Sequence, residues 1–248
     1  MLAIVLSRRN FREYDQVVSL YTAESGKREV LARGIKKIIA KNAGALEPAS
    51  LSAVEIVPGR EIDYLATAQP LALFPGLRSD LIKSWQAQRA IHLIDRLTHV
   101  GEKQPALFKL LEEWLIALER ASKPEATGIL ALVWRLLDQL GFRPDLTGAA
   151  ASKTTATIFS VSQGGIVSAG VSAVPDIPEG DQIFSLTGHL VAVLKLFLAG
   201  SWSVIFQLSL AKKDFTTLNN LTYAYAAYHT GVVFPAWQDA DKMLGENK

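Results

Sequence analysis

The first part of the chain, residues 1 to about 75, contains short runs in which β-branched and aromatic residues alternate with polar residues or cluster between turn residues. Runs of this kind are typical of β-strands. Strands are expected at 2–6, 16–21, 28–31, 51–57 and 61–66. Ser25-Gly26 and Pro58-Gly59 favour tight turns after the second and the fourth of these strands. Five short strands leave exposed edges unless the sheet closes on itself, so the pattern predicts a small barrel.

From residue 78 the apolar positions recur every three or four residues, the period of an amphipathic helix. Positions 87, 90, 91, 94 and 97 form one apolar face, and positions 107, 108, 111, 115 and 118 form a second. A third helix is framed by Pro124 and Gly141. A fourth is expected between Ser185 as N-cap and Gly200 as stop, and a fifth at 215–231. Amphipathic helices with short connections predict a bundle.

Between 141 and 179 the helical pattern stops, and small residues and Pro surround two apolar runs at 158–161 and 166–167. The sequence Ser162-Gln163-Gly164-Gly165 between the runs predicts a hairpin turn. The predicted fold class is therefore α+β, with a β-barrel at 1–76 and a helical domain at 77–248. The β-hairpin insert is expected at about 143–180 of that helical domain.

Composition narrows the class of protein further. The 248 residues are 49% hydrophobic and 20% charged, which is typical of a globular chain with a sizeable core. Cys is absent, which excludes disulfides, thiolate zinc sites and a Cys nucleophile and fits a reducing cytoplasm. The apolar start precedes Arg8 and Arg9, the reverse of the order in a signal peptide. The longest apolar stretch is about half of the ~20 residues that span a membrane, so no such span is expected.

Motifs for catalysis are missing from the sequence: it contains no G-x-G-x-x-G, Walker loop, H-E-x-x-H or G-x-S-x-G. His92 and His99 could share one helix face, but a pair lacks further metal ligands, and ordinary helix histidines explain them better. Glu112 and Glu113 point about 100° apart on a helix, which disfavours a paired-carboxylate site. We expect no catalytic residues, no metal and no cofactor, and a protein that is not an enzyme.

Charge is unevenly distributed along the chain. The first 45 residues hold nine Lys or Arg and four Asp or Glu, whereas the remainder holds 17 and 20. A solvated basic loop would explain this without a partner. The same region carries Phe11, Tyr14, Tyr21 and Tyr64, and a small barrel with basic loops and aromatic faces is typical of modules that bind single strands. Tyr21 is expected in the core rather than on the surface.

The helical part offers a weaker candidate surface. Its tryptophans could line a groove for a partner peptide, although core packing is the better interpretation of each. The tryptophans meant here are those within or next to the predicted helices, Trp85, Trp114, Trp134 and Trp202. Arg135 could anchor a partner's carboxylate, and an Arg that lies along the surface explains it equally well.

Several segments resemble the bacterial recombination mediator RecO family. They are "IVLSRRNFREYDQVVSLYTAESGKREVLARGIKK" from residue 4, "GALEPASL" from residue 44, "FPGLRSDL" from residue 74 and "LLDQLGFRPDL" from residue 136. The resemblance is strong to about residue 146 and weaker beyond it. It implies that the barrel is an OB-fold and that the chain works in recombinational DNA repair.

The family resemblance also implies partners. Its members bind single- and double-stranded DNA, anneal complementary strands and act with RecR to load RecA onto DNA coated by the single-strand-binding protein. They hold that protein's acidic C-terminal tail through the helical domain, and a bacterial cytoplasmic, nucleoid-associated location follows. The cations that the resemblance places in the DNA-binding module are Arg8, Arg9, Arg12, Lys27, Arg28, Arg33, Lys36, Lys37 and Lys41.

One departure from the family concerns metal. Many members carry two Cys-x-x-Cys pairs that form a zinc site on the hairpin, and spacing puts those positions near Ala149, Ser152, Ser168 and Val171. None of these residues supplies a thiolate, so the hairpin must be held by packing. The segment after His229 also departs from the family's usual ending.

The sequence thus leads to one hypothesis and one alternative. The hypothesis is a strand-annealing mediator that captures phosphates with its OB module and a partner's tail with its helical domain. The alternative is a protein-interaction adaptor that binds a partner tail without binding DNA directly, because a fold does not fix a function.

Overall fold

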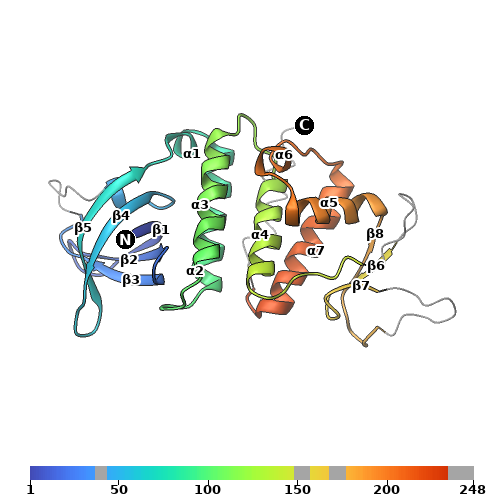
Figure 1. The fold of residues 1–248 in the computed structure, drawn as a ribbon, viewed down its shortest axis with the longest axis horizontal. Coiled ribbons are helices and arrows are strands. Elements are labelled where there is room, and N and C mark those ends of the chain that lie inside the picture. Colours follow the sequence, from blue (N-terminus) through green and yellow to red (C-terminus); the bar gives the residue numbers. More distant parts are fainter. Residues whose placement is uncertain (37–43, 148–156, 168–176, 234–248) are drawn as a thin grey trace. The chain divides into compact units, whose positions relative to one another are not determined.

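The structure is a computed structural model, and it describes residues 1–36, 44–147, 157–167 and 177–233. Packing divides the chain into two compact units, Met1–Pro124 and Glu125–Lys248. The first contains the barrel and three helices, and the second contains the remaining helices and a small sheet (Figure 1). The α+β class is confirmed. The division into functional domains at 1–76 and 77–248 remains a prediction.

The barrel of the first unit is built from β1 (Leu2–Asn10), β2 (Gln16–Thr22), β3 (Gly26–Ala32), β4 (Leu51–Val57) and β5 (Asp63–Ala72). It closes in the order β1-β2-β3-β5-β4, with β3 parallel to β5 and the other pairs antiparallel. The predicted OB-like barrel is therefore confirmed. β1 runs beyond the predicted residue 6, because its pairing with β2 resumes after an irregularity between Val5 and Ser7.

Every second side chain along a strand points into the barrel, and these side chains form its core. Its buried members on the strands include Ala3, Val5, Val18, Leu20, Val30 and Val54, and Leu46 joins them from the 3₁₀ helix η1 (Gly44–Leu46). Gly26 begins β3 at a φ of 67°, in the left-handed region that glycine tolerates, which confirms the turn predicted from Ser25-Gly26.

Three helices complete the first unit: α1 (Pro75–Ser79), α2 (Leu81–Leu97) and α3 (Pro105–Arg120). Asp80 is the N-cap of α2, and its carboxylate accepts a hydrogen bond from the Lys83 backbone N–H at 3.0 Å. The apolar faces predicted for α2 and α3 are the buried ones, including Ala87 and Ile91 on α2 and Leu111 on α3.

The second unit contains α4 (Thr127–Gln139), α5 (Gly188–Ala199), α6 (Trp202–Ile205) and α7 (Lys212–Thr230). Its sheet has the order β7-β6-β8, from β6 (Thr157–Ser160), β7 (Gly165–Val167) and β8 (Ile183–Leu186). The predicted hairpin is β6 and β7, but β8 was not expected. Ser185 was predicted as an N-cap, and this is wrong: it lies in β8 opposite Ile158. Thr187 caps α5 instead, accepting from the Leu190 N–H at 3.3 Å.

Aromatic packing and hydrogen bonds from α7 fasten the hairpin. The Tyr225 ring lies 4.8 Å from Trp134 and 5.7 Å from Phe159, measured between centroids. Its hydroxyl lies 3.4 Å from the Gly164 carbonyl oxygen, and His229 Nε2 lies 2.9 Å from that of Val161. Ring packing and these hydrogen bonds thus hold this described part of the hairpin. The four positions that the family resemblance relates to zinc ligands, near 149, 152, 168 and 171, lie outside the described residues.

No helix within the described ranges is both long and apolar enough to cross a membrane.

Candidate nucleic-acid interface

Two segments meet at the end of the barrel where β1 ends and β2 begins. They are the β1–β2 loop, residues 11–15, and residues 33–36, which follow β3. The Lys36 backbone N–H donates to the Tyr14 carbonyl oxygen at 3.2 Å, and the Gly34 N–H donates to Asp15 Oδ1 at 2.8 Å. The rings and the cation of the β1–β2 loop therefore lie at the same place on the surface as the cations of residues 33–36.

The side chains of these segments combine positive charge with exposed aromatic surface. Phe11 is 51% exposed and Tyr14 is 47% exposed. The Arg12 guanidinium lies 5.1 Å from the Phe11 ring centroid. Arg33 lies 4.2 Å from the ring centroid of Tyr64, which β5 contributes. We call this set the loop patch; it consists of Phe11, Arg12, Tyr14, Arg33, Lys36 and Tyr64.

The cations of the loop patch keep their charge uncompensated. Within the described residues, no carboxylate lies at ion-pair distance from Arg12, Arg33 or Lys36. Lys36 Nζ donates to the neutral carbonyl oxygen of Glu13 at 3.2 Å, which leaves its charge available. Glu13 and Asp15 are the acidic residues of the loop. The Asp15 carboxylate accepts from the Gly34 N–H, and the hydrogen bond of Glu13 with Tyr14 raises the pKa of the Tyr14 hydroxyl. Tyr14 therefore stays neutral at physiological pH.

The other predicted cations that the structure describes are ion-paired. Arg8 pairs with Glu47 at 2.9 Å, Arg9 with Glu29 at 2.8 Å and Lys27 with Asp95 at 2.9 Å. Arg28 pairs with Asp63, and this hydrogen bond is the main reason that the pKa of Asp63 is lowered. Lys37 and Lys41 lie outside the described residues.

Helix α2 covers part of the outer barrel surface on β1, β2 and β3. Asp95 of α2 accepts hydrogen bonds from Ser7 Oγ at 2.9 Å and Ser19 Oγ at 2.7 Å, in addition to its ion pair with Lys27. We call these four residues the Asp95 cluster. Burial raises the pKa of Asp95, but the hydrogen bonds from Lys27, Ser19 and Ser7 outweigh it and the pKa is lowered.

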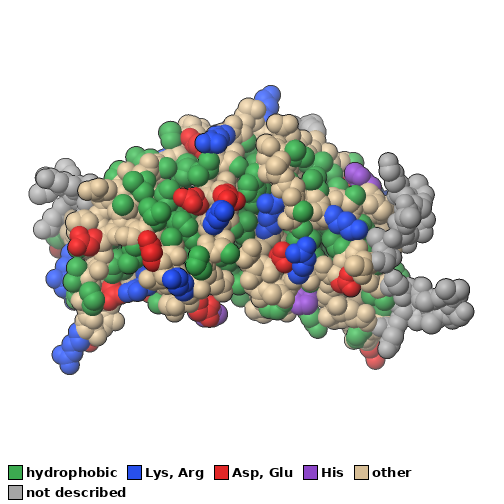
Figure 2. All heavy atoms as spheres, viewed as in Figure 1, with side chains coloured by type: hydrophobic (Ala, Val, Ile, Leu, Met, Phe, Trp, Pro, Cys, Tyr) green, Lys and Arg blue, Asp and Glu red, His purple; other side chains and the backbone are tan. Residues whose placement is uncertain are grey.

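OB-folds often bind oligonucleotides on the outer surface of their strands. In this protein α2, held by the Asp95 cluster, covers part of that surface. Tyr21, on β2, is fully buried as predicted, and burial raises its pKa to about 12, with a smaller contribution from Glu102. Acidic and basic side chains are intermixed over α2 and α3 on the face of this unit seen in Figure 2. Arg12, Arg33 and Lys36 lie instead in the loop segments, without an ion pair among the described residues.

Arg60 is a candidate that sequence reasoning missed. It is exposed in the β4–β5 loop, residues 58–62, and loops at this position are a common binding element of OB-folds. Gly59 next to it lies so close to Tyr64 that a Cβ there would be 2.7 Å from Tyr64 Cε2. Arg60 therefore adjoins the loop patch, and the predicted Pro58-Gly59 turn was the available signal.

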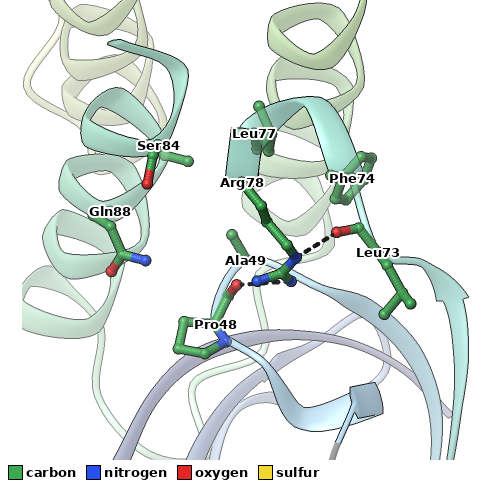
Figure 3. A pocket seen from close by; sticks show the side chains of 9 residues that line it. Pro48, Ala49, Leu73, Phe74, Leu77, Arg78, Ser84 and Gln88 are labelled. Carbon is green, nitrogen blue, oxygen red and sulfur yellow. Dashed lines mark hydrogen bonds between the residues drawn. The ribbon is translucent and has the colours of Figure 1, made fainter. Parts of the chain in front are cut away.

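A pocket on the first unit lies where the barrel meets α1 and α2 (Figure 3). Arg78 points into it from α1, donating from Nε to the Leu73 carbonyl oxygen at 2.9 Å and from Nη2 to that of Pro48 at 3.4 Å. Nη2 also donates to Ser50 Oγ at 2.8 Å. Because the Arg78 guanidinium is already hydrogen-bonded to these groups, we interpret the pocket as the place where α1 is fastened to the barrel.

The tryptophans of the helical part are mostly core residues, as predicted. Trp114, Trp134 and Trp202 are buried, and Trp85 is half-buried beneath Arg89. Arg135 donates to the carbonyl oxygens of Phe197, at 2.7 Å, and Gly200, and its guanidinium lies 3.9 Å from the Trp202 ring centroid. Arg135 thus holds the carboxyl end of α5.

The two helix histidines do not converge. His92 is exposed on α2, and His99, beyond the end of that helix, lies 3.7 Å from Glu102. Among the described residues no three His, Asp or Glu side chains form a metal-binding group.

A five-stranded OB-like barrel with cations and rings on its loops defines a protein of the oligonucleotide-binding architectural class. Comparisons with known proteins identify the family. The model "Recombination protein O N terminal" matches residues 1–74, and "Recombination protein O C terminal" matches residues 78–237. The chain belongs to the RecO family.

Individual relatives carry the name "DNA repair protein RecO". The one from Desulforamulus reducens is 28% identical over 250 residues, covering 99% of this chain and 94% of the relative. The one from Geobacter sulfurreducens is 35% identical over 151 residues, covering 60% of this chain and 61% of the relative. The one from Cutibacterium acnes is 28% identical over 209 residues, covering 81% and 82%.

Proposed function

We propose that this protein is a DNA-binding recombination mediator in DNA repair, which captures DNA phosphates with the cations of its barrel. It anneals complementary strands and, with RecR, helps to load RecA onto DNA coated by the single-strand-binding protein. Membership of the RecO family supports this role. The observation that carries it is the uncompensated charge of Arg12, Arg33 and Lys36 beside exposed rings.

The physical basis is release of counterions from DNA. Each phosphate neutralised by a protein cation releases condensed counterions, so affinity falls as salt rises. A cation that is already paired with a carboxylate contributes less, because contact with phosphate would first break that pair. We therefore assign the main contacts to Arg12, Arg33 and Lys36.

The remaining predicted cations are ranked by their surroundings. Arg9 is two-thirds exposed beside Glu29 and can turn toward a phosphate, whereas Arg8 and Arg28 are more enclosed in their pairs. Lys27 is only 12% exposed within the Asp95 cluster and is assigned a structural role. Lys37 and Lys41 continue the basic segment in sequence and remain predicted contacts.

The partner proposals rest on the family. We propose that the helical domain holds the acidic tail of the single-strand-binding protein, and that the protein works in the bacterial cytoplasm at the nucleoid. Its action is by binding and presentation of strands, without covalent chemistry.

The test is fluorescence anisotropy of a labelled single-stranded oligonucleotide at several salt concentrations. Each of Arg12→Gln, Arg33→Gln and Lys36→Gln should lower the slope of log affinity against log salt by about 0.7, and the triple variant by about 2. The matched control is Lys103→Gln. Lys103 packs beside Gly26, at the opposite end of β3 from Arg33 and roughly 20 Å away along the strand.

The outcomes separate the two functional hypotheses. A reduced slope in the patch variants with an unchanged slope in Lys103→Gln supports DNA capture by the loop patch. Equal slopes in all variants contradict that assignment. A wild-type protein that ignores DNA and binds the tail peptide of the single-strand-binding protein at high salt would be an adaptor instead.

A further inference from the structure

We infer that Phe11 and Tyr14 stack on unpaired bases, so that the loop patch holds single strands by their phosphates and base faces and leaves the pairing edges free. This inference rests on the proposed DNA-binding function and specifies which part of the nucleic acid each side chain contacts. Such stacking would give the loop patch a higher affinity for single strands than for duplexes, because the bases of a duplex are already stacked on one another.

The exposure of these rings is the first observation. Isolated exposed apolar residues are normal on protein surfaces and need no explanation. Here two rings, each about half exposed, flank Arg12 in one five-residue loop, and the adjoining segment adds Arg33 and Lys36. A surface that combines cations with exposed rings can hold a single strand, because phosphates and bases require both kinds of contact.

The loop is also held in place before any ligand arrives. The backbone N–H groups of Phe11 and Arg12 donate to the Asp15 carbonyl oxygen at 3.2 and 3.4 Å. The Asp15 carboxylate accepts from Gly34, and the Tyr14 carbonyl accepts from Lys36. A loop fixed by these four hydrogen bonds loses less conformational entropy on binding than a free one, which favours its use as a stacking platform.

Tyr64 has a different role in this arrangement. Arg33 lies over its ring, and Gly59 packs against its edge, so the ring is less available for a base. We assign Tyr64 as a positioning residue that holds the Arg33 guanidinium for phosphate.

Two amide side chains next to the loop patch are hydrogen-bonded to each other. Gln16 Nε2 donates to Asn10 Oδ1 at 3.2 Å, across the base of the β1–β2 loop. Amide side chains are typical readers of base edges, and this pair is engaged internally. Contact with base faces through rings is sequence-tolerant, since every base has such a face. A strand held in this way can still pair with its complement, which is what annealing requires.

The experiment compares three labelled ligands of equal length, about 15 nucleotides, chosen to exceed the site of one OB-fold. They are a single strand, an abasic single strand with the same phosphates, and a duplex. Phe11→Leu/Tyr14→Leu should bind the normal single strand about 5- to 100-fold more weakly. Its affinity for the abasic strand and the duplex, and its salt slope, should stay at wild-type values.

Conservative changes and a remote ring serve as controls. Tyr14→Phe keeps the ring and removes the hydroxyl that bonds Glu13, so it should retain wild-type affinity. Tyr228→Leu removes a ring that is 60% exposed on α7, in the other unit, and should have no effect on any of the three ligands. Circular dichroism and thermal melting confirm that each variant is folded.

The possible failures are distinct. Equal loss for the normal and abasic strands would show that the rings only shape the loop, and unchanged affinity for the normal strand would show that they do not contact bases. Either result overturns stacking while DNA binding stands. Salt-insensitive binding or none by the wild-type protein would overturn the proposed function itself.

Discussion

The Asp95 cluster makes a quantitative prediction about how α2 is held on the barrel. Asp95→Asn keeps the size of the side chain and removes the charge that opposes Lys27. The pair is well enclosed, since the two side chains are 12% and 21% exposed. Two serine hydroxyls also depend on the same carboxylate, and the amide oxygen of Asn can replace only part of that acceptor capacity.

The expected cost follows from these contacts. Removing one partner of a buried ion pair costs about 3–5 kcal/mol, because the other charge is left without compensation. Residual exposure lets water solvate part of the Lys27 charge, which reduces this figure to about 2–3 kcal/mol. One weakened serine hydrogen bond adds about 0.5–1.5 kcal/mol. We therefore expect α2 to be destabilised by about 3 kcal/mol, or roughly a hundredfold in its opening equilibrium.

Hydrogen exchange of the α2 amides in the full chain measures this quantity directly. A two-unit chain need not unfold in one step, so exchange at α2 is preferred to a global denaturant midpoint. The matched control is Asp138→Asn, whose partner Arg143 is 67% exposed; its effect should be about 0–1 kcal/mol. Exchange rates at α2 that are the same in Asp95→Asn and Asp138→Asn would refute the assigned role of the cluster.

Two further predictions concern stability. Because the folded pKa of Asp95 is lowered, its contribution is present above the ordinary carboxyl pKa of about 3.9 and is lost as pH falls through the folded value. Protection of α2 should thus decline with acid in the wild type and more weakly in Asp95→Asn; parallel declines would contradict this. Gly128→Ala should cost about 1–3 kcal/mol, measured by thermal melting, because its Cβ would lie 2.2 Å from Phe206 Cε1. Gly44→Ala, which meets nothing within 4 Å, is the control, and equal melting temperatures would count against the reasoning.

The barrel was predictable because local pattern and tertiary structure agree there. Alternating residues define the strands, and the turn residues lie where the chain reverses, as at Gly26. The short sheet of the second unit was harder. Ser185 and Thr187 are both residue types that commonly cap helices. Pairing of β8 with β6 places Ser185 in a strand, so Thr187 is the residue that caps α5. Such pairing joins residues that are distant in sequence.

The candidate site shows the same limit. Nine cations could be predicted from the sequence as a group. Which of them are free of ion pairs could not be predicted, because the carboxylates that pair with them come from distant segments. Glu47 lies 39 residues from Arg8, and Asp95 lies 68 residues from Lys27. Arg60 was missed for the opposite reason: it is an isolated cation in the sequence, and the barrel brings its neighbour Gly59 against Tyr64.

Ion pairing therefore distinguishes the cations that could contact a phosphate better than the number of cations does. The same strand, β3, shows both cases: Lys27 at its start is bound by α2, whereas Arg33 just beyond its end is held over an aromatic ring with no carboxylate at ion-pair distance among the described residues. A phosphate approaching Lys27 would have to displace Asp95, whereas one approaching Arg33 meets no carboxylate paired with it in the described part of the chain. If the barrel binds strands, we expect the contact to begin at the loops. Contact of a phosphate with these loop cations does not first require an internal ion pair to break.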